Sequence, residues 1–203
     1  MSSVDATAAG ASGNDLPGRD IEQRGLYFEE FELGARYLHR PGRTATEADN
    51  VLFTTLTMNT QALHLDAAFA ATQPFGKPLM NSMWTLWTMV GASVAQLTQG
   101  TLVAQLGMGD IAFPLPLFAG DTLYTETTPT AARLSGSRPG QGIVTLRHTG
   151  RNQHGEIVAV ASRTALVWCV GAMQWPSILA PRCCFAPQTD RSATRRHLSA
   201  LMR

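Results

Sequence analysis

Residues 81–99 limit the possible folds more than any other part of the chain. They contain no charged residue, and their apolar side chains would cover nearly the whole circumference of a helix. A helix that is apolar on all sides must be surrounded by other elements. Polar residues such as Asn81, Thr85 and Gln96 interrupt the stretch, so we expect a buried helix and not a transmembrane span.

Segments typical of β-strands follow this helix. They are rich in Val, Ile, Thr and Leu and are separated by Gly and Pro; they comprise residues 102–113, 122–134, 142–151 and 156–170. A hairpin turn at 152–155 would join the last two. Before the central helix, we predict a strand near 36–40 and a helix from Thr46, with Asp49 as the acid of a capping box, to about Met58.

This order of elements predicts an α+β fold, in which an antiparallel sheet wraps round one long apolar helix. We expect a disordered segment at 1–24, a single domain at 25–170 and a tail at 171–203, with a short helix at 192–203 as an alternative for its end. Apolar residues make up 44% of the chain, which suits one core. The net charge of +1 gives no reason to expect nucleic acid or a membrane as a partner.

Cysteine usage and the first residues indicate the compartment. Three cysteines occur, and two of them, Cys183 and Cys184, are adjacent. This arrangement predicts neither a disulfide framework nor a zinc site. The polar, small-residue beginning of the chain is unlike a secretory signal, so we expect a cytoplasmic protein.

Several motifs occur in a fixed order between Tyr27 and Val170. Residues 59–64 (NTQALH) resemble the Asp-x-Asn-Pro-Leu/Ile-His motif of MaoC-like, (R)-specific enoyl-CoA hydratases. Residues 75–85 (FGKPLMNSMWT) resemble that family's Phe-Gly-x-Pro-Ile-x-His-Gly-Met-x-Thr segment. Later matches are Pro116 with Gly-Asp-Thr-Leu at 120–123, and Asn-Gln-x-Gly-Glu at 152–156.

The resemblance implies a hot-dog fold and an acyl-CoA substrate. It further implies reversible hydration of a 2-enoyl-CoA without metal or redox cofactor, in a homodimer or higher homo-oligomer. His64 would be the general base, with Asn59 in the position of the catalytic acid. Backbone N–H groups would bind the thioester oxyanion, and two other residues would contact substrate. The oxyanion donors would be Asn81, Ser82 and Met83, and the substrate contacts Gly76 and Arg138.

The chain departs from the family pattern at two of these positions. Asn59 replaces the motif Asp, and an amide orients a water molecule but does not exchange its proton. Asn81-Ser82 replaces His-Gly, a change that preserves backbone N–H donors at a helix start. Either His64 works without the acid or the activity is lost. Asp66 is an alternative acid, but we expect it to cap a short helix that begins at Ala67.

Other functions are therefore kept as alternatives. The protein could bind acyl-CoA without turnover, or support an active partner as a pseudo-enzyme subunit. A thioesterase is less favoured, since residues 81–99 carry no carboxylate to activate water. If the protein is a hydratase, its departures from the family motifs resemble those of a branch that acts on short, branched or dicarboxylic acyl-CoAs such as mesaconyl-CoA. Trp84 and Trp87 are expected in the core.

Overall fold

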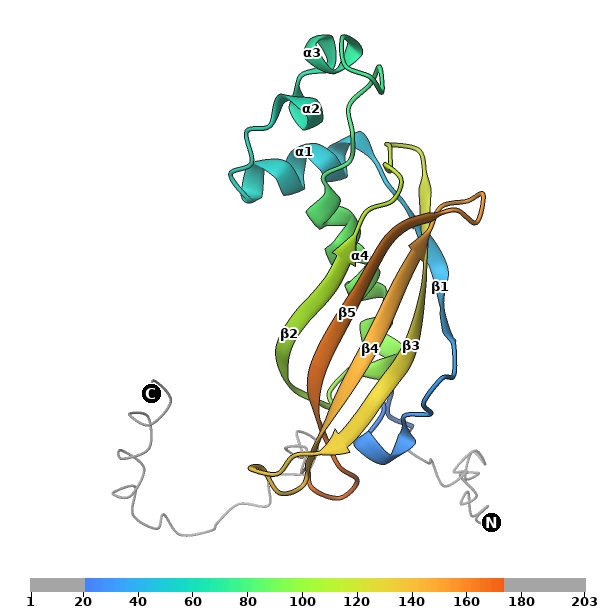
Figure 1. The fold of residues 1–203 in the computed structure, drawn as a ribbon, viewed down its shortest axis with the longest axis vertical. Coiled ribbons are helices and arrows are strands. Elements are labelled where there is room, and N and C mark those ends of the chain that lie inside the picture. The colour runs from blue at the N-terminus through green and yellow to red at the C-terminus, as the bar shows by residue number, and fades with distance from the viewer. Residues whose placement is uncertain (1–20, 174–203) are drawn as a thin grey trace, which may run out of the picture. The chain divides into compact units, whose positions relative to one another are not determined.

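The protein was analysed as a computed structural model that describes residues 21–173. Its five strands form one antiparallel sheet in the order β1-β3-β4-β5-β2, and the helices precede the second strand (Figure 1). The elements are η1 (Phe28–Glu30), β1 (Tyr37–Thr44), α1 (Glu47–Leu56), α2 (Ala62–Leu65), α3 (Ala67–Ala71), α4 (Ser82–Leu97), β2 (Leu102–Ala112), β3 (Thr122–Leu134), β4 (Gln141–Arg151) and β5 (Ile157–Trp168).

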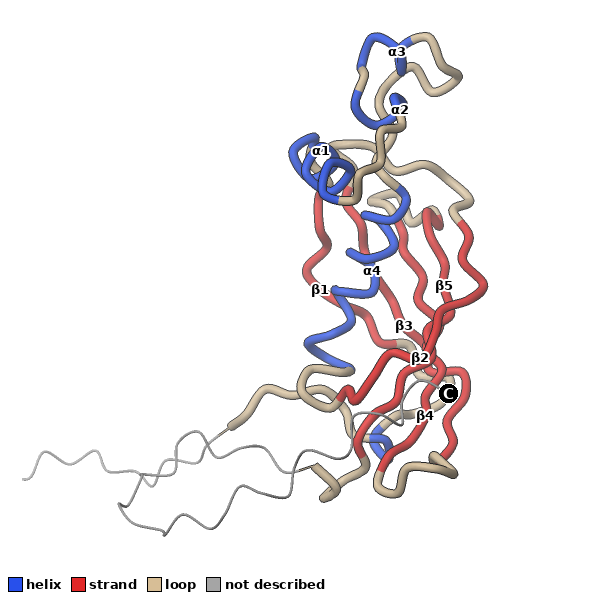
Figure 2. Tube along the Cα trace, turned by 90° about the vertical axis from the view of Figure 1, so that its left-hand side faces the viewer, coloured by secondary structure: helices blue, strands red, loops and turns tan. Residues whose placement is uncertain are grey.

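The predicted α+β architecture is confirmed. The sheet curves round α4, and both views show the helix running along its concave side (Figures 1 and 2). The strands lie within a few residues of the predicted segments, and a turn at 152–155 joins β4 to β5. Thr46 caps α1 and Asp49 completes the capping box, as predicted. The tail and most of the N-terminal segment lie outside the described residues.

The central helix is buried on one side only. Its inward residues enter the two clusters of the core, and the largest of them include Trp84, Met89 and Leu97. On the same helix, however, Met83 is 42% and Trp87 is 46% exposed. These two residues are one turn apart and share a face. The prediction of burial on all sides is therefore wrong, because the single sheet covers only one side of α4. Within residues 21–173, no helix is long and apolar enough to cross a membrane.

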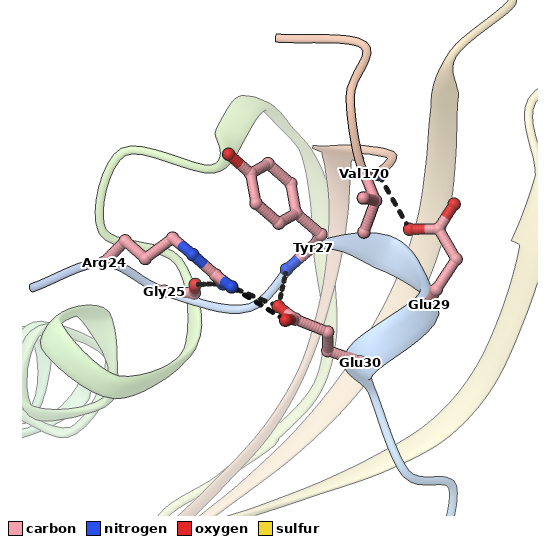
Figure 3. Close-up of polar contacts among 6 residues, drawn as sticks. All are labelled: Arg24, Gly25, Tyr27, Glu29, Glu30 and Val170. Carbon is pink, nitrogen blue, oxygen red and sulfur yellow. Dashed lines mark hydrogen bonds and ion pairs between the residues drawn. The ribbon is translucent and has the colours of Figure 1, made fainter. Parts of the chain in front are cut away.

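Polar contacts fasten the start of the domain to its end (Figure 3). The Arg24 guanidinium donates to both carboxylate oxygens of Glu30, at 2.6 and 2.8 Å, and lies 4.5 Å from the ring centroid of Tyr27. The Glu29 carboxylate accepts the N–H of Val170 at 2.9 Å. The ordered domain thus includes Arg24, which lies one residue ahead of the predicted boundary.

A buried hydrogen-bonded chain crosses the sheet beneath α4. His39 Nδ1 lies 3.0 Å from Gln96 Oε1, so Nδ1 carries the hydrogen and Nε2 accepts from the hydroxyl of Thr127 at 2.8 Å. Thr127 Oγ1 then accepts from His148 Nδ1, also at 2.8 Å. The remaining nitrogen of His148, Nε2, has no hydrogen-bond partner among the described residues, nor do Nε and Nη1 of the buried Arg163. Burial lowers the pKa of both histidines, which favours their neutral forms.

Candidate active site

His64 lies on the one-turn helix α2, above the N-terminal end of α4 (Figure 1). Its Nδ1 is 2.9 Å from the carbonyl oxygen of Leu79. A carbonyl oxygen only accepts, so Nδ1 carries the hydrogen, and Nε2 of the neutral ring has a free lone pair. Hydrogen bonding of one ring nitrogen thus prepares the other to take a proton.

Two cavities meet at this half-buried imidazole. The first, of about 250 Å³, is lined by Glu47, Asn50, Val51, His64, Leu65, Ala67, Lys77, Pro78, Phe118 and Ala119. The second, of about 240 Å³, is lined by His64, Phe75, Leu79, Met80, Ser82, Thr85, Phe113, Pro114, Leu115, Pro116, Leu117 and Val158. The first has charged groups at its edge, whereas the second is mostly apolar with two hydroxyls.

Ser82, at the start of α4, lines the second cavity and has a free backbone N–H. Of the three predicted oxyanion donors, the N–H of Asn81 donates to Asn50 Oδ1 at 2.8 Å, and that of Met83 donates to Asn81 Oδ1 at 3.0 Å. The N–H of Ser82 has no partner within residues 21–173. Of these three residues, Ser82 alone keeps a free N–H, because side-chain capping occupies its two neighbours, and its role as an oxyanion donor stays a prediction. The 16-residue helix directs the positive end of its dipole to this point.

The Asn59 side chain has a local structural task. Its Oδ1 accepts the backbone N–H of Gln61 at 3.0 Å, and the backbone N–H of Asn59 donates to Thr54 O at 3.0 Å. These bonds form the turn between α1 and α2. Asn59 lines neither cavity, so the structure does not bring its amide to the space in front of His64.

The two predicted substrate contacts are placed differently. Gly76 adopts a left-handed backbone (φ 68°) in the loop that carries the cavity residues Phe75 and Lys77 on either side of it. Arg138 is exposed in the connection between β3 and β4. That connection lies at the opposite end of the sheet from α2, so Arg138 and His64 are not brought together within one chain (Figure 1).

Asp66 behaves as expected and caps α3, accepting the N–H of Phe69 at 2.9 Å. Sequence reasoning missed two residues that border the first cavity. Asn50 is 4% exposed and contacts three separate backbone groups. Lys77 holds its Nζ 4.1 Å from the centroid of the Phe118 ring. The available signal for Asn50 was its position within a helix, since Asn has a low helix propensity.

Comparison with known proteins gives consistent matches. Residues 29–152 match the family described as MaoC like domain. The chain is 30% identical to β-methylmalyl-CoA dehydratase of Chloroflexus aurantiacus over 70% of this chain and 40% of the relative. Identity to mesaconyl-CoA hydratase of Haloarcula marismortui is 28%, over 73% of this chain and 41% of the relative. The chain thus spans about two fifths of the length of these curated relatives.

Solved structures give the same fold. A monoamine oxidase regulatory protein from Archaeoglobus has a TM-score of 0.66 and 30% identity, and the match covers 73% of this chain and 99% of that one. The (R)-hydratase from Aeromonas caviae has a TM-score of 0.57 and 28% identity, with 68% and 97% covered. A Mycobacterium tuberculosis protein with a double hot-dog fold has a TM-score of 0.66 and 23% identity, with 84% and 54% covered. The predicted hot-dog fold is confirmed.

Proposed function

Because the chain belongs to the family of MaoC-like domains, we propose that it catalyses the reversible hydration of a 2-enoyl-CoA, with His64 as the general base. This proposal rests on the hydrogen bonding of the His64 ring. Nδ1 donates to Leu79 O, which leaves Nε2 as an acceptor on a residue that lines two cavities. Ser82, whose backbone N–H is free, lines one of these cavities and supports the same reaction.

The proposed steps balance without a metal ion or redox cofactor. His64 Nε2 takes a proton from water as the oxygen adds to C3 of the enoyl group. Negative charge then develops on the thioester oxygen, where the Ser82 N–H at the helix start stabilises it. The imidazolium returns its proton to C2, so one group serves as base and then as acid. This cycle does not require Asn59 to exchange a proton.

The cavities support a short acyl group. A volume of about 240 Å³ is below the roughly 300–1,000 Å³ usual for drug-sized ligands, so the mostly apolar cavity suits a compact chain. Lys77 at the edge of the other cavity offers a cation for a carboxylate or a CoA phosphate. Relatives that act on mesaconyl-CoA and β-methylmalyl-CoA favour short, branched or dicarboxylic substrates.

The proposal is tested with mesaconyl-CoA, crotonyl-CoA and a long straight-chain enoyl-CoA. We expect the absorbance of the conjugated thioester to fall fastest with the short substrates, at a rate that a metal chelator does not change. Free thiol is measured in parallel. Release of CoA from a saturated acyl-CoA would instead indicate a thioesterase. Tight binding without turnover would indicate an acyl-CoA-binding protein or a pseudo-enzyme subunit.

The proposal includes a homodimer in the cytoplasm. Strand β2 ends the sheet and exposes Leu106 (50%) and Ile111 (43%), in addition to the stripe of Met83 and Trp87 on α4. Edge strands and contiguous apolar surface are commonly covered by a second subunit. Cys169, the one cysteine within residues 21–173, has a free thiol there.

Replacing Trp87 by glutamate is expected to raise the dissociation constant of this dimer by roughly 30-fold or more, because a buried aromatic anchor becomes a charge. Sedimentation at micromolar concentration measures the change. Leu38→Glu is the matched control, since Leu38 is equally exposed (46%) but lies on the opposite edge strand. A monomeric wild type, or dissociation by the Leu38 variant alone, would refute the proposed interface.

A further inference from the structure

A single buried amide connects the segments that carry the base and the oxyanion donor. Asn50, on α1, donates from Nδ2 to the carbonyl oxygens of His64 at 3.1 Å and Leu79 at 2.9 Å. Its Oδ1 accepts the N–H of Asn81 at 2.8 Å. Asn50 is 4% exposed, so water does not readily replace these bonds. Three stretches of chain that are distant in sequence thereby meet at one side chain.

Each of these bonds acts on a group of the proposed reaction. The oxygen of Leu79 that accepts from Asn50 also accepts from Nδ1 of His64, at 2.9 Å. Fixing this oxygen fixes the ring orientation and keeps the hydrogen on Nδ1. The bond from the Asn81 N–H holds the Met80–Asn81 peptide, one residue before the free N–H of Ser82 at the start of α4.

We infer that Asn50 is a positioning residue that holds His64 Nε2 and the Ser82 N–H in a fixed relative geometry. The inference rests on the proposed hydration for its kinetic consequence, but its structural consequence is independent of any substrate. The amide is suited to this task because it provides two donors and an acceptor at once. A second contact, from Asn81 Nδ2 to Thr54 Oγ1 at 3.2 Å, secures Asn81 without involving His64.

The kinetic test is Asn50→Leu, which keeps the approximate size and removes every hydrogen bond. We expect kcat for hydration to fall about 10²-fold with KM nearly unchanged, as for misplacement of a catalytic group. Thr127→Val is the matched control: Thr127 is fully buried, hydrogen-bonds to His39 and His148, and borders neither cavity. It is expected to lower the melting temperature while keeping kcat.

A second readout needs no turnover. Nitrogen chemical shifts of the His64 ring, assigned by comparison with His64→Ala, are expected to report the Nδ1–H tautomer in wild type and mixed tautomers in Asn50→Leu. Lost tautomer preference in a protein without hydratase activity would uphold the positioning role and refute the proposed function. An unchanged tautomer in Asn50→Leu overturns the inference, whatever happens to kcat.

Asn50→Ser covers the case in which the leucine variant does not fold. Its small side chain leaves room for a water molecule near the same carbonyl oxygens, so a smaller loss in kcat and a partial change of tautomer are expected. Wild-type values for both quantities in this variant would overturn the inference.

Discussion

Replacing His64 by alanine is expected to lower kcat/KM for enoyl-CoA hydration by about 10²–10⁴-fold, the usual contribution of a positioned acid–base group. The loss is expected mainly in kcat, because the imidazole moves a proton in the transition state and contributes little to binding the CoA moiety. Initial rates with mesaconyl-CoA and crotonyl-CoA measure the effect.

The alanine variant should remain folded. Leu79 O, which loses the ring hydrogen bond, keeps the one from Asn50 at 2.9 Å, and His64 is only half-buried. His154→Ala is the matched control, because His154 is exposed in the turn between β4 and β5. A His64 variant with near wild-type turnover would assign the proton transfers to another group and refute the proposed mechanism.

Acidification from pH 6.5 to 5 is expected to lower the free energy of unfolding by about 2 kcal/mol through His148 alone. Burial, reinforced by the charge of Arg163 and by His39, lowers the pKa of His148 to about 3 from the ordinary 6.5. Between these values the unfolded chain binds a proton that the folded protein does not. The stabilisation is therefore complete above pH 6.5 and is lost as the pH falls towards 3, by a total on the order of 4–5 kcal/mol.

Urea unfolding at pH 7.5, 6.5, 5.5 and 5.0 measures how the free energy of unfolding changes with pH. This range lies above the ordinary pKa of carboxyl groups. His148→Asn places an amide where Nδ1 now donates to Thr127 and does not titrate, so its stability should depend less on pH. Burial also lowers the pKa of His39, so the free energy of unfolding of the variant still depends in part on pH. Parallel curves for variant and wild type would show that His148 titrates normally.

The elements of the domain were largely predictable because their signals are local. Turn residues bound each strand, and the capping box of Thr46 and Asp49 marked the start of α1. The burial of α4 was overestimated, since an apolar composition does not distinguish a side that the sheet covers from a side that it leaves exposed. Met83 and Trp87 carry the same hydropathy signal as the core residues of α4 and yet are exposed.

The site was less predictable than the fold. His64 and the start of α4 follow from the motifs, but the occupied N–H groups of Asn81 and Met83 depend on where side chains lie. Asn50 was missed because the low helix propensity of Asn does not show that α1 turns this side chain inward. Arg138 lies at the other end of the sheet from α2 within one chain, and sequence does not state which end of the sheet a hairpin occupies.

Residues 57–80, which carry α2 and α3, form one continuous excursion outside the sheet (Figure 1). His64 and several walls of both cavities belong to this stretch, whereas Met80 is its only member in the two buried clusters of the core. Both cavities are thus built from two parts of the chain, this stretch and walls such as Val51, Phe118 and Val158. A laboratory graft of residues 57–80 between relatives would exchange one part of those walls, and it must preserve the contacts of Asn50 with His64, Leu79 and Asn81.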